Sequence, residues 1–162
     1  MMKRIVLDSS KKEAVIHLIY ECAMAVDDGD LKKWPDFFAE NGSYYVYPRD
    51  NYESGFPIAL IMDDNKDKIK DRVTIIEKIW TYNIQYQRHI ISNIIVTESE
   101  DNKVQAYSNF VIHLTDREGN TNWKLVGKYL DTVVFEEESP KFEKRIAILD
   151  TFTLPNYFVY PL

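Results

Sequence analysis

The stretch Arg88-His89-Ile90-Ile91-Ser92-Asn93-Ile94-Ile95-Val96 decides the fold of this chain, because its run of β-branched residues predicts a long, largely buried strand. One His and two short polar side chains interrupt this apolar run. Buried polar groups are costly unless they are hydrogen-bonded. Such a strand is therefore typical of a pocket, a polar network or a subunit contact. Strict alternation predicts that His89, Ile91, Asn93 and Ile95 face one way and their neighbours the other.

The apolar period changes along the chain and predicts helices first and strands later. Helices are predicted over residues 10–26, 31–38 and 63–80, and two short strands over residues 43–47 and 58–62. Four long strands follow, over residues 88–98, 103–114, 121–137 and 141–154, joined by short polar turns. Helices followed by an antiparallel meander predict an α+β fold, as one domain over residues 1–162, with the helices packed on one face of a strongly curved sheet.

Local signals refine the helices. Ser10 and Glu13 have the spacing of a capping box, so the first helix is expected to begin there. Cys22 falls on the apolar side of that helix, where a Cys is most often a small hydrophobic residue. Arg72, in the third helix, is expected to pair with Asp63 or Asp64, or to anchor an interface.

Composition excludes several classes of function. The 162-residue chain has a formal net charge of −6, which argues against nucleic-acid binding, since that rests on a basic patch. Its single Cys excludes an internal disulfide framework and a multi-thiolate metal site. No apolar run approaches the ~20 residues that span a bilayer, and the first seven residues do not resemble a signal peptide. We therefore expect a cytoplasmic protein without membrane or nucleic-acid partners.

Three segments together resemble the beta (small) subunit of aromatic-ring-hydroxylating, Rieske non-haem iron dioxygenases. The segments are Trp34-x-x-Phe37-Phe38 leading to Tyr45-x-Tyr47-Pro48; Asp63-Asp64, Asp71-Arg72-Val73, Trp80 and Arg88-His89-x-x-Ser92-Asn93; and Trp123-Lys124-Leu125-x-x-Lys128 with Ile148-Leu149-Asp150. The resemblance implies the cone-shaped fold of the nuclear-transport-factor-2-like (SnoaL-like) superfamily. It also implies a homotrimer that joins a catalytic alpha subunit, with a non-catalytic, structural role in the catabolism of aromatic compounds.

Counting possible ligands supports that role. A Rieske cluster needs two Cys and two His, and this chain has one Cys and three His. A mononuclear oxygenase iron needs two His and a carboxylate on one face, whereas the three His are predicted on a helix surface and two different strands. We therefore expect no cofactor and no metal in this chain, and both the Rieske cluster and the mononuclear iron in the alpha subunit.

The same superfamily contains enzymes, which keeps an alternative open. Asp27 and His89 resemble the Asp–His dyad of scytalone dehydratase and hexachlorocyclohexane dehydrochlorinase. As a stand-alone lyase or isomerase, the chain would use His89 as a base, with Tyr45 or Tyr107 polarising the substrate. A third possibility is a small-ligand-binding protein of the same fold. Among these readings we favour Asp27 and His89 as a polar network that pins the first helix to the sheet.

One face of the predicted sheet carries a mixture of polar and aromatic residues. These are Tyr107, Asn109, Val111 and His113 beside Lys124, Val126, Lys128 and Leu130. Mixed faces with aromatic residues suit oligomer interfaces, so we expect this face to meet another subunit.

Overall fold

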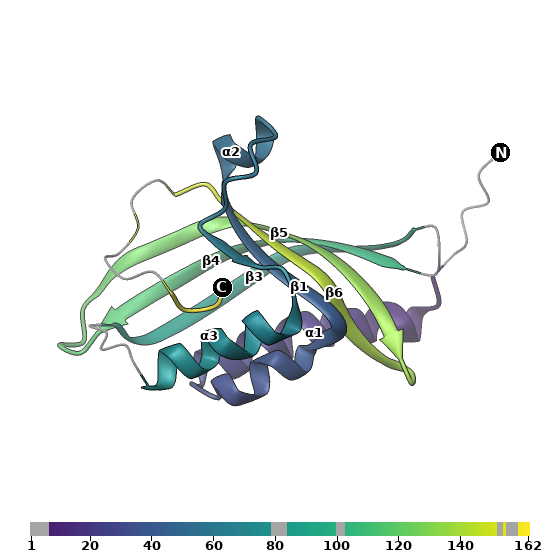
Figure 1. The fold of residues 1–162 in the computed structure, drawn as a ribbon, viewed down its shortest axis with the longest axis horizontal. Coiled ribbons are helices and arrows are strands. Elements are labelled where there is room, and N and C mark those ends of the chain that lie inside the picture. Colours follow the sequence, from purple (N-terminus) through teal and green to yellow (C-terminus); the bar gives the residue numbers. More distant parts are fainter. Residues whose placement is uncertain (1–6, 79–83, 100–102, 152–153, 155–158) are drawn as a thin grey trace.

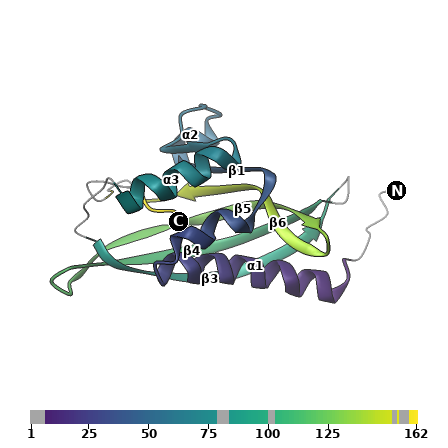
Figure 2. The same cartoon turned by 60° about the horizontal axis from the view of Figure 1, so that its bottom comes forward.

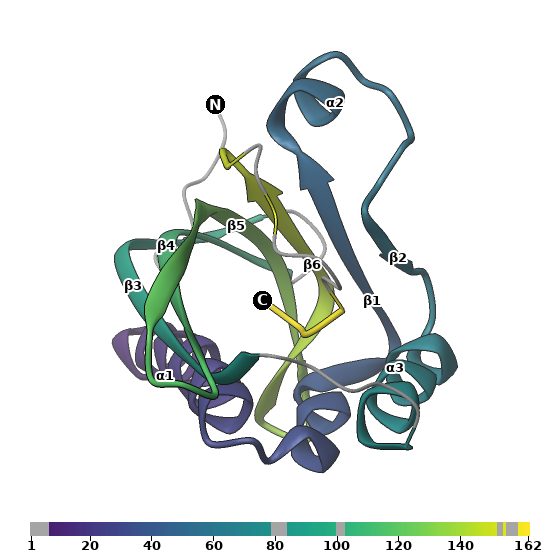
Figure 3. The same ribbon diagram turned by 90° about the vertical axis from the view of Figure 1, so that its left-hand side faces the viewer.

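A six-stranded sheet dominates the computed structural model, which describes residues 7–78, 84–99, 103–151, 154 and 159–162. The strands lie in the order β2-β1-β6-β5-β4-β3. Their bounds are β1 Phe38–Pro48, β2 Ile61–Asp63, β3 Ile84–Glu98, β4 Val104–Asp116, β5 Thr121–Glu136 and β6 Ser139–Leu149. The sheet is strongly curved (Figure 1), and the helices close its open side when it is seen along the long axis (Figure 3). The expected α+β class is confirmed.

The four long strands pair antiparallel in chain order, as their short polar turns predict. β6 ends at Leu149, so the prediction that this strand continues to residue 154 is wrong for residues 150, 151 and 154. Residues 152–153 lie outside the described part of the chain.

β1 departs from the predicted all-antiparallel sheet, because it pairs parallel with β6. A parallel pair needs a long crossover connection, and here four strands and two helices separate the two partners along the chain. β1 is also longer than predicted, although it ends at Pro48 as expected. The second short strand, predicted over residues 58–62, forms over Ile61–Asp63.

A β-bulge in β3 changes which side chains face the helices. The register with β4 shifts between Ser92 and Ile95, and Asn93 has a φ of 55°, a left-handed conformation that Asn tolerates. His89 faces the helices as predicted, but Ile95 is 60% exposed and Ile94 packs against the core instead. Strict alternation is therefore wrong beyond the bulge, since one extra residue exchanges the two faces.

Four helical segments accompany the sheet: α1 Ser9–Asp27, the 3₁₀ helix η1 Leu31–Phe37, α2 Arg49–Glu53 and α3 Lys66–Lys78. α1 lies along β3 (Figure 2), whereas α2 projects beyond the end of β1 (Figure 1). The capping-box prediction is wrong, because α1 has Asp8 at its N-cap and no side-chain capping hydrogen bond, which leaves Ser10 inside the helix. Trp80, expected on the third helix, lies outside the described residues.

The apolar side chains of the helices meet one face of the sheet, called here the inner face; the opposite side is the outer face. Cys22 on α1 and Ile69, Val73 and Ile76 on α3 are buried as predicted. Trp34 and Tyr44 pack edge to face, with ring centroids 5.1 Å apart, at the centre of this core. No helix among the described residues is long and apolar enough to cross a membrane.

Candidate functional site

The inner face brings together Asp27, the last residue of α1, and His89, near the start of β3. The carboxylate contacts His89 twice. Oδ2 accepts the main-chain N–H at 2.9 Å, and Oδ1 lies 2.5 Å from ring atom Nδ1. The side chains of His89 and Asp27 are only 2% and 6% exposed. A carboxylate at Nδ1 favours the tautomer in which Nδ1 carries the proton, so in a neutral ring Nε2 holds the lone pair.

The second ring nitrogen of His89 is enclosed. Nε2 has no exposed surface and no hydrogen-bond partner among the described residues. A hollow of about 410 Å³ lies beside the pair, with Asp27, Gln87 and Tyr160 in its wall, but His89 is not among its described lining residues. As far as the described lining shows, Nε2 of His89 does not open onto this hollow. The two hydrogen bonds therefore join the end of α1 to β3.

The two tyrosines considered with this pair lie elsewhere. Tyr107 is 45% exposed on the outer face of β4, between the buried residues Ala106 and Ser108. Tyr45 alternates with the buried Tyr44 on β1 and stacks on Tyr47. The structure thus brings Asp27 and His89 together but places both tyrosines on the opposite side of the sheet.

The structure contains a buried ion pair that was not predicted from the sequence, between Asp131 on β5 and Arg145 on β6. Asp131 Oδ1 and Arg145 Nε are 3.4 Å apart, and the two side chains are 0% and 2% exposed. The guanidinium carbon lies 3.9 Å from the ring centroid of Tyr129 and 4.6 Å from that of Phe142. Burial raises the pKa of the Asp131 carboxyl from its ordinary 3.8 to about 6, against the opposing effect of Arg145.

The pattern of β5 and β6 contained a signal for this pair. Asp131 alternates with buried Tyr129 and Val133, so it occupies an inward position of a half-buried strand. Pairing of the two strands across their short turn sets Asp131 directly opposite Arg145. Two opposite charges at facing inward positions predict a buried ion pair.

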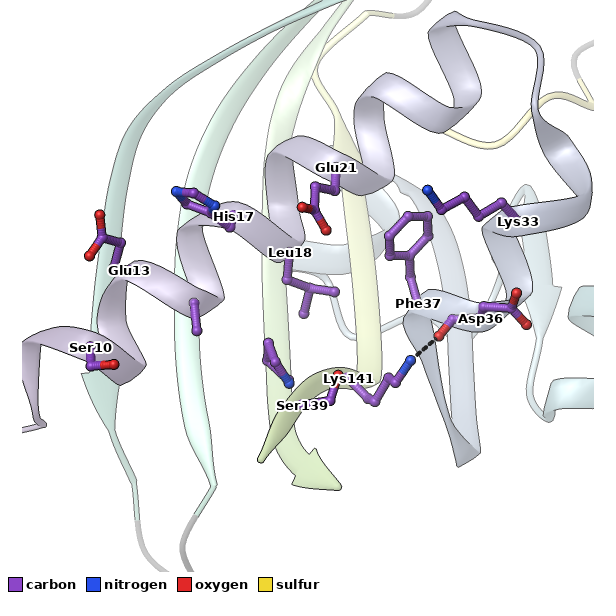
Figure 4. A pocket seen from close by; sticks show the side chains of 12 residues that line it. Ser10, Glu13, His17, Leu18, Glu21, Lys33, Asp36, Phe37, Ser139 and Lys141 are labelled. Atoms are coloured by element: carbon purple, nitrogen blue, oxygen red, sulfur yellow. Dashed lines mark hydrogen bonds between the residues drawn. The ribbon is translucent and has the colours of Figure 1, made fainter. Parts of the chain in front are cut away.

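A surface groove of about 470 Å³ separates the first half of α1 from η1 and the β5–β6 turn. Figure 4 shows His17 on α1 between Glu13 and Glu21, one helical turn away on either side. Across the groove, Lys141 donates a hydrogen bond to the main-chain carbonyl of Asp36. The lining of the groove combines acidic and basic side chains with apolar ones. His17 is exposed, as the sequence predicted.

Comparison with known proteins decides the family. Residues 21–156 match the family model described as ring hydroxylating beta subunit. The chain belongs to the ring-hydroxylating beta subunit family. The small subunit of anthranilate 1,2-dioxygenase from Burkholderia cepacia is 27% identical to it over 137 residues, or 85% of each chain.

Solved structures confirm the fold of this beta subunit family member. A structure described as the beta subunit of an aromatic-ring-hydroxylating dioxygenase from Novosphingobium aromaticivorans DSM 12444 has a TM-score of 0.85 and 26% identity, covering 94% of this chain and 97% of that chain. A protein from the same organism described as a scytalone dehydratase has a TM-score of 0.72 and 16% identity, over 93% and 91% of the two chains. That likeness concerns the fold alone. The expected cone-shaped, nuclear-transport-factor-2-like fold is thus confirmed.

Among the described residues, the side chains that could bind iron do not gather in one place. The described His side chains are dispersed, with His17 exposed on α1, His89 held by Asp27, and His113 on the outer face of β4. Burial raises the pKa of the Cys22 thiol to about 11, which disfavours the thiolate that a metal needs. Within the described ranges, no three His, Cys, Asp or Glu side chains are grouped so that they could hold a metal ion.

Proposed function

We propose that this chain is a non-catalytic subunit that assembles with the catalytic alpha subunit of a cytoplasmic ring-hydroxylating dioxygenase acting in aromatic catabolism. Membership of the beta subunit family supports the proposal. The ligand count of the sequence supports it further, since two Cys and two His for a Rieske cluster must come from another chain. Both iron centres would then lie in the alpha subunit.

The observation that carries the proposal is an apolar row on the outer face, in register across all six strands. Its members, from β2 to β3, are Met62, Tyr45, Ile146, Leu130, Tyr107 and Ile95. Met62 and Tyr107 are each 45% exposed and Ile95 is 60% exposed. Contiguous apolar surface of this kind marks protein contact sites, because a monomer gains by covering it.

Charge on the outer face indicates what kind of surface would cover it. The outward positions of β3, β4 and β5 within residues 88–97, 105–115 and 124–134 hold no Asp or Glu. One row of this face holds Arg88, His113 and Lys124, in register across β3, β4 and β5. Lys128 follows Lys124 by four residues on β5 and faces the same way. These outward positions therefore carry positive charge, although the whole chain has a net charge of −6. An apolar and acidic partner surface complements this face.

The same charges bear on the proposed homotrimer. Two copies joined outer face to outer face would bring like charges together. A ring of three copies instead joins different surfaces of neighbouring subunits, as cyclic trimers require. We therefore propose that each outer face meets an acidic surface, either of the next copy or of the alpha subunit.

Co-expression with an alpha subunit encoded in the same genome tests this function. Ile95→Asp places a charge in the apolar row, and Met24→Asp is the matched control, because Met24 on α1 is 59% exposed. We expect iron protein to co-purify with the wild type and the control, and at least tenfold less with Ile95→Asp. Equal recovery with both variants would contradict the proposed role of the outer face. Sedimentation of the chain alone as a monomer at micromolar concentration would contradict the trimer.

A second candidate function, proton abstraction by His89, draws on the contact with Asp27. The enclosed Nε2 and the distant tyrosines favour the polar pin instead. His89→Ala separates the two functions. If His89 only holds α1 to β3, the variant should keep the turnover of each assembled oxygenase complex near the wild-type value. If the chain is a stand-alone lyase, the variant should lose its activity by orders of magnitude.

A further inference from the structure

The connection between β1 and β2, residues 49–60, stands away from the body of the molecule and is called here the arm. Figure 3 shows α2 beyond the end of β1, away from the rest of the sheet. α2 has no buried residue. The large apolar side chains of the arm are all exposed, namely Tyr52, Phe56, Ile58 and Leu60. The arm therefore presents apolar surface that the described part of the chain leaves largely uncovered.

Hydrogen bonds hold the backbone of the arm in one conformation, although its side chains are exposed. Asn51 donates from Nδ2 to the carbonyl of Ile58 at 3.0 Å. The Phe56 N–H donates to the Asn51 carbonyl at 2.9 Å, and the Leu60 N–H donates to the carbonyl of Val46 on β1 at 2.7 Å. The apolar side chains are thus presented in a fixed arrangement. Such a preorganised surface loses little conformational entropy when a partner covers it.

Ion pairs join both ends of the arm to the body of the molecule. At its start, Arg49 pairs with Asp150, the residue that follows β6, at 2.9 Å. Beyond its other end, Asp63 on β2 pairs with Arg72 on α3 through both Nε and Nη2, as predicted. The position of the arm is therefore set by β6 and α3 rather than by burial of its own side chains.

The arm is acidic as well as apolar, so it has the character that the outer face requires of a partner. Four charged side chains lie on α2 and at its contact with β6, namely Arg49, Asp50, Glu53 and Asp150. One cation and three carboxylates leave this group with a net charge of −2. The outer face offers the opposite charge and an apolar row, so the two surfaces complement each other.

The arm and the basic side chains of the outer face belong to opposite edges of the sheet. The arm connects β1 to β2 at one edge, whereas the basic side chains lie on β5, β4 and β3, toward the other. The apolar row runs between these edges, from Met62 on β2 to Ile95 on β3, and spans about 24 Å at a strand spacing of ~4.8 Å. Complementary surfaces at opposite edges fit a head-to-tail contact, and such contacts close a ring of identical copies.

We propose that the arm of each subunit docks on the outer face of the next subunit, over β5, β4 and β3. The inference rests on the homotrimer proposed above and names the two surfaces that each of its contacts joins. The apolar side chains of the arm, among them Phe56 and Ile58, cover the apolar row of the next copy around Ile95. The carboxylates of Asp50 and Glu53 face the basic side chains of that copy.

Sedimentation of single variants tests the two surfaces separately. Ile58→Asp places a charge on the arm, and Ile95→Asp places one on the outer face. Both side chains are at least 60% exposed, so the fold should persist, which circular dichroism checks. Met24→Asp is the matched control, because Met24 is 59% exposed on α1. At micromolar concentration, we expect the wild type and the control to sediment as trimers and the other two variants as monomers.

Mixing the two monomeric variants tests whether the arm docks on the outer face. Ile95→Asp keeps an intact arm and Ile58→Asp keeps an intact outer face, so one contact can form between them although the ring cannot close. At high micromolar concentration, tagged Ile58→Asp should capture at least tenfold more untagged Ile95→Asp than untagged Ile58→Asp. Equal capture of the two would overturn the inference.

The inference is also overturned if Ile58→Asp sediments as a trimer like the wild type. If that trimeric variant recovers at least tenfold less iron protein in the co-expression described above, the arm belongs to the contact with the alpha subunit instead. The proposed function then stands without the arm contact. A wild-type chain that sediments as a monomer removes the homotrimer and the arm contact together, whereas loss of iron protein with the wild type removes the assembly with the alpha subunit.

Discussion

Removing the Asp27 carboxylate is the most direct test of the polar pin between α1 and β3. Asp27→Ala leaves two buried donors of His89 without their acceptor, the main-chain N–H at 2.9 Å and the ring Nδ1 at 2.5 Å. Each unpaired buried donor costs about 1–3 kcal/mol. The variant should therefore lose about 2–5 kcal/mol in free energy of unfolding, a large part of the ~5–15 kcal/mol that a domain of this size possesses.

Urea unfolding followed by Trp fluorescence measures the loss, provided that the dependence on urea concentration stays unchanged. Asp28→Ala is a matched control one residue along the chain, because Asp28 is exposed and both hydrogen bonds of His89 go to Asp27. The control should stay within about 0.5 kcal/mol of the wild type. In a double-mutant cycle with His89→Leu, the coupling should reach about 2 kcal/mol. If Asp27→Ala and Asp28→Ala differ by less than about 1 kcal/mol, the pin is refuted.

Three further predictions concern the core. Burial raises the pKa of Asp131 to about 6, above its ordinary 3.8, so its contribution to stability is present below pH 3.8 and is lost as the pH rises through 6. The loss of stability amounts to up to about 3 kcal/mol. When stability is measured against pH, Arg145→Met should shift this loss to higher pH, and Asp131→Asn should abolish it. Identical curves for the wild type and the two variants would contradict the prediction. Gly127→Ala should cost more than about 2 kcal/mol in urea unfolding, since the new Cβ would lie 2.1 Å from the Ile148 carbonyl oxygen, and a neutral effect would show that the two strands can separate. Tyr44→Phe removes the hydroxyl that accepts the Leu162 N–H, so it should cost about 1 kcal/mol in free energy of unfolding and speed the amide exchange of Leu162. An unchanged exchange rate would argue against this hydrogen bond as an anchor for residues 159–162.

The sequence predicted most of the local structure correctly, because burial on one face leaves a period in the chain. The apolar period of α3 placed Ile69, Val73 and Ile76 in the core. The short polar turns predicted the antiparallel pairing of the long strands. The contact between Asp27 and His89 was expected from the resemblance to the Asp–His dyad of enzymes in the same superfamily, and the structure shows it as two hydrogen bonds.

Other features could not be predicted from local pattern. The bulge at Asn93 exchanges the faces of β3 beyond it, and nothing in the alternation of the residues marks the extra position. The parallel pairing of β1 with β6 depends on contacts between residues about 100 positions apart, such as Tyr45 and Ile146. The positions of Tyr45 and Tyr107 on the outer face, away from His89, follow from the same register.

The sequence by itself thus determined the order and type of the elements, the family resemblance and the lack of a full set of iron ligands, because these depend on residue type and short-range spacing. Only the tertiary structure decided which polar groups are enclosed. It set Asp131 against Arg145 on neighbouring strands, buried Nε2 of His89, and brought Leu162 into the core, where its N–H donates to Tyr44. Burial and partner choice are properties of the whole packed chain, since each depends on residues that come together only when the sheet curves around the helices.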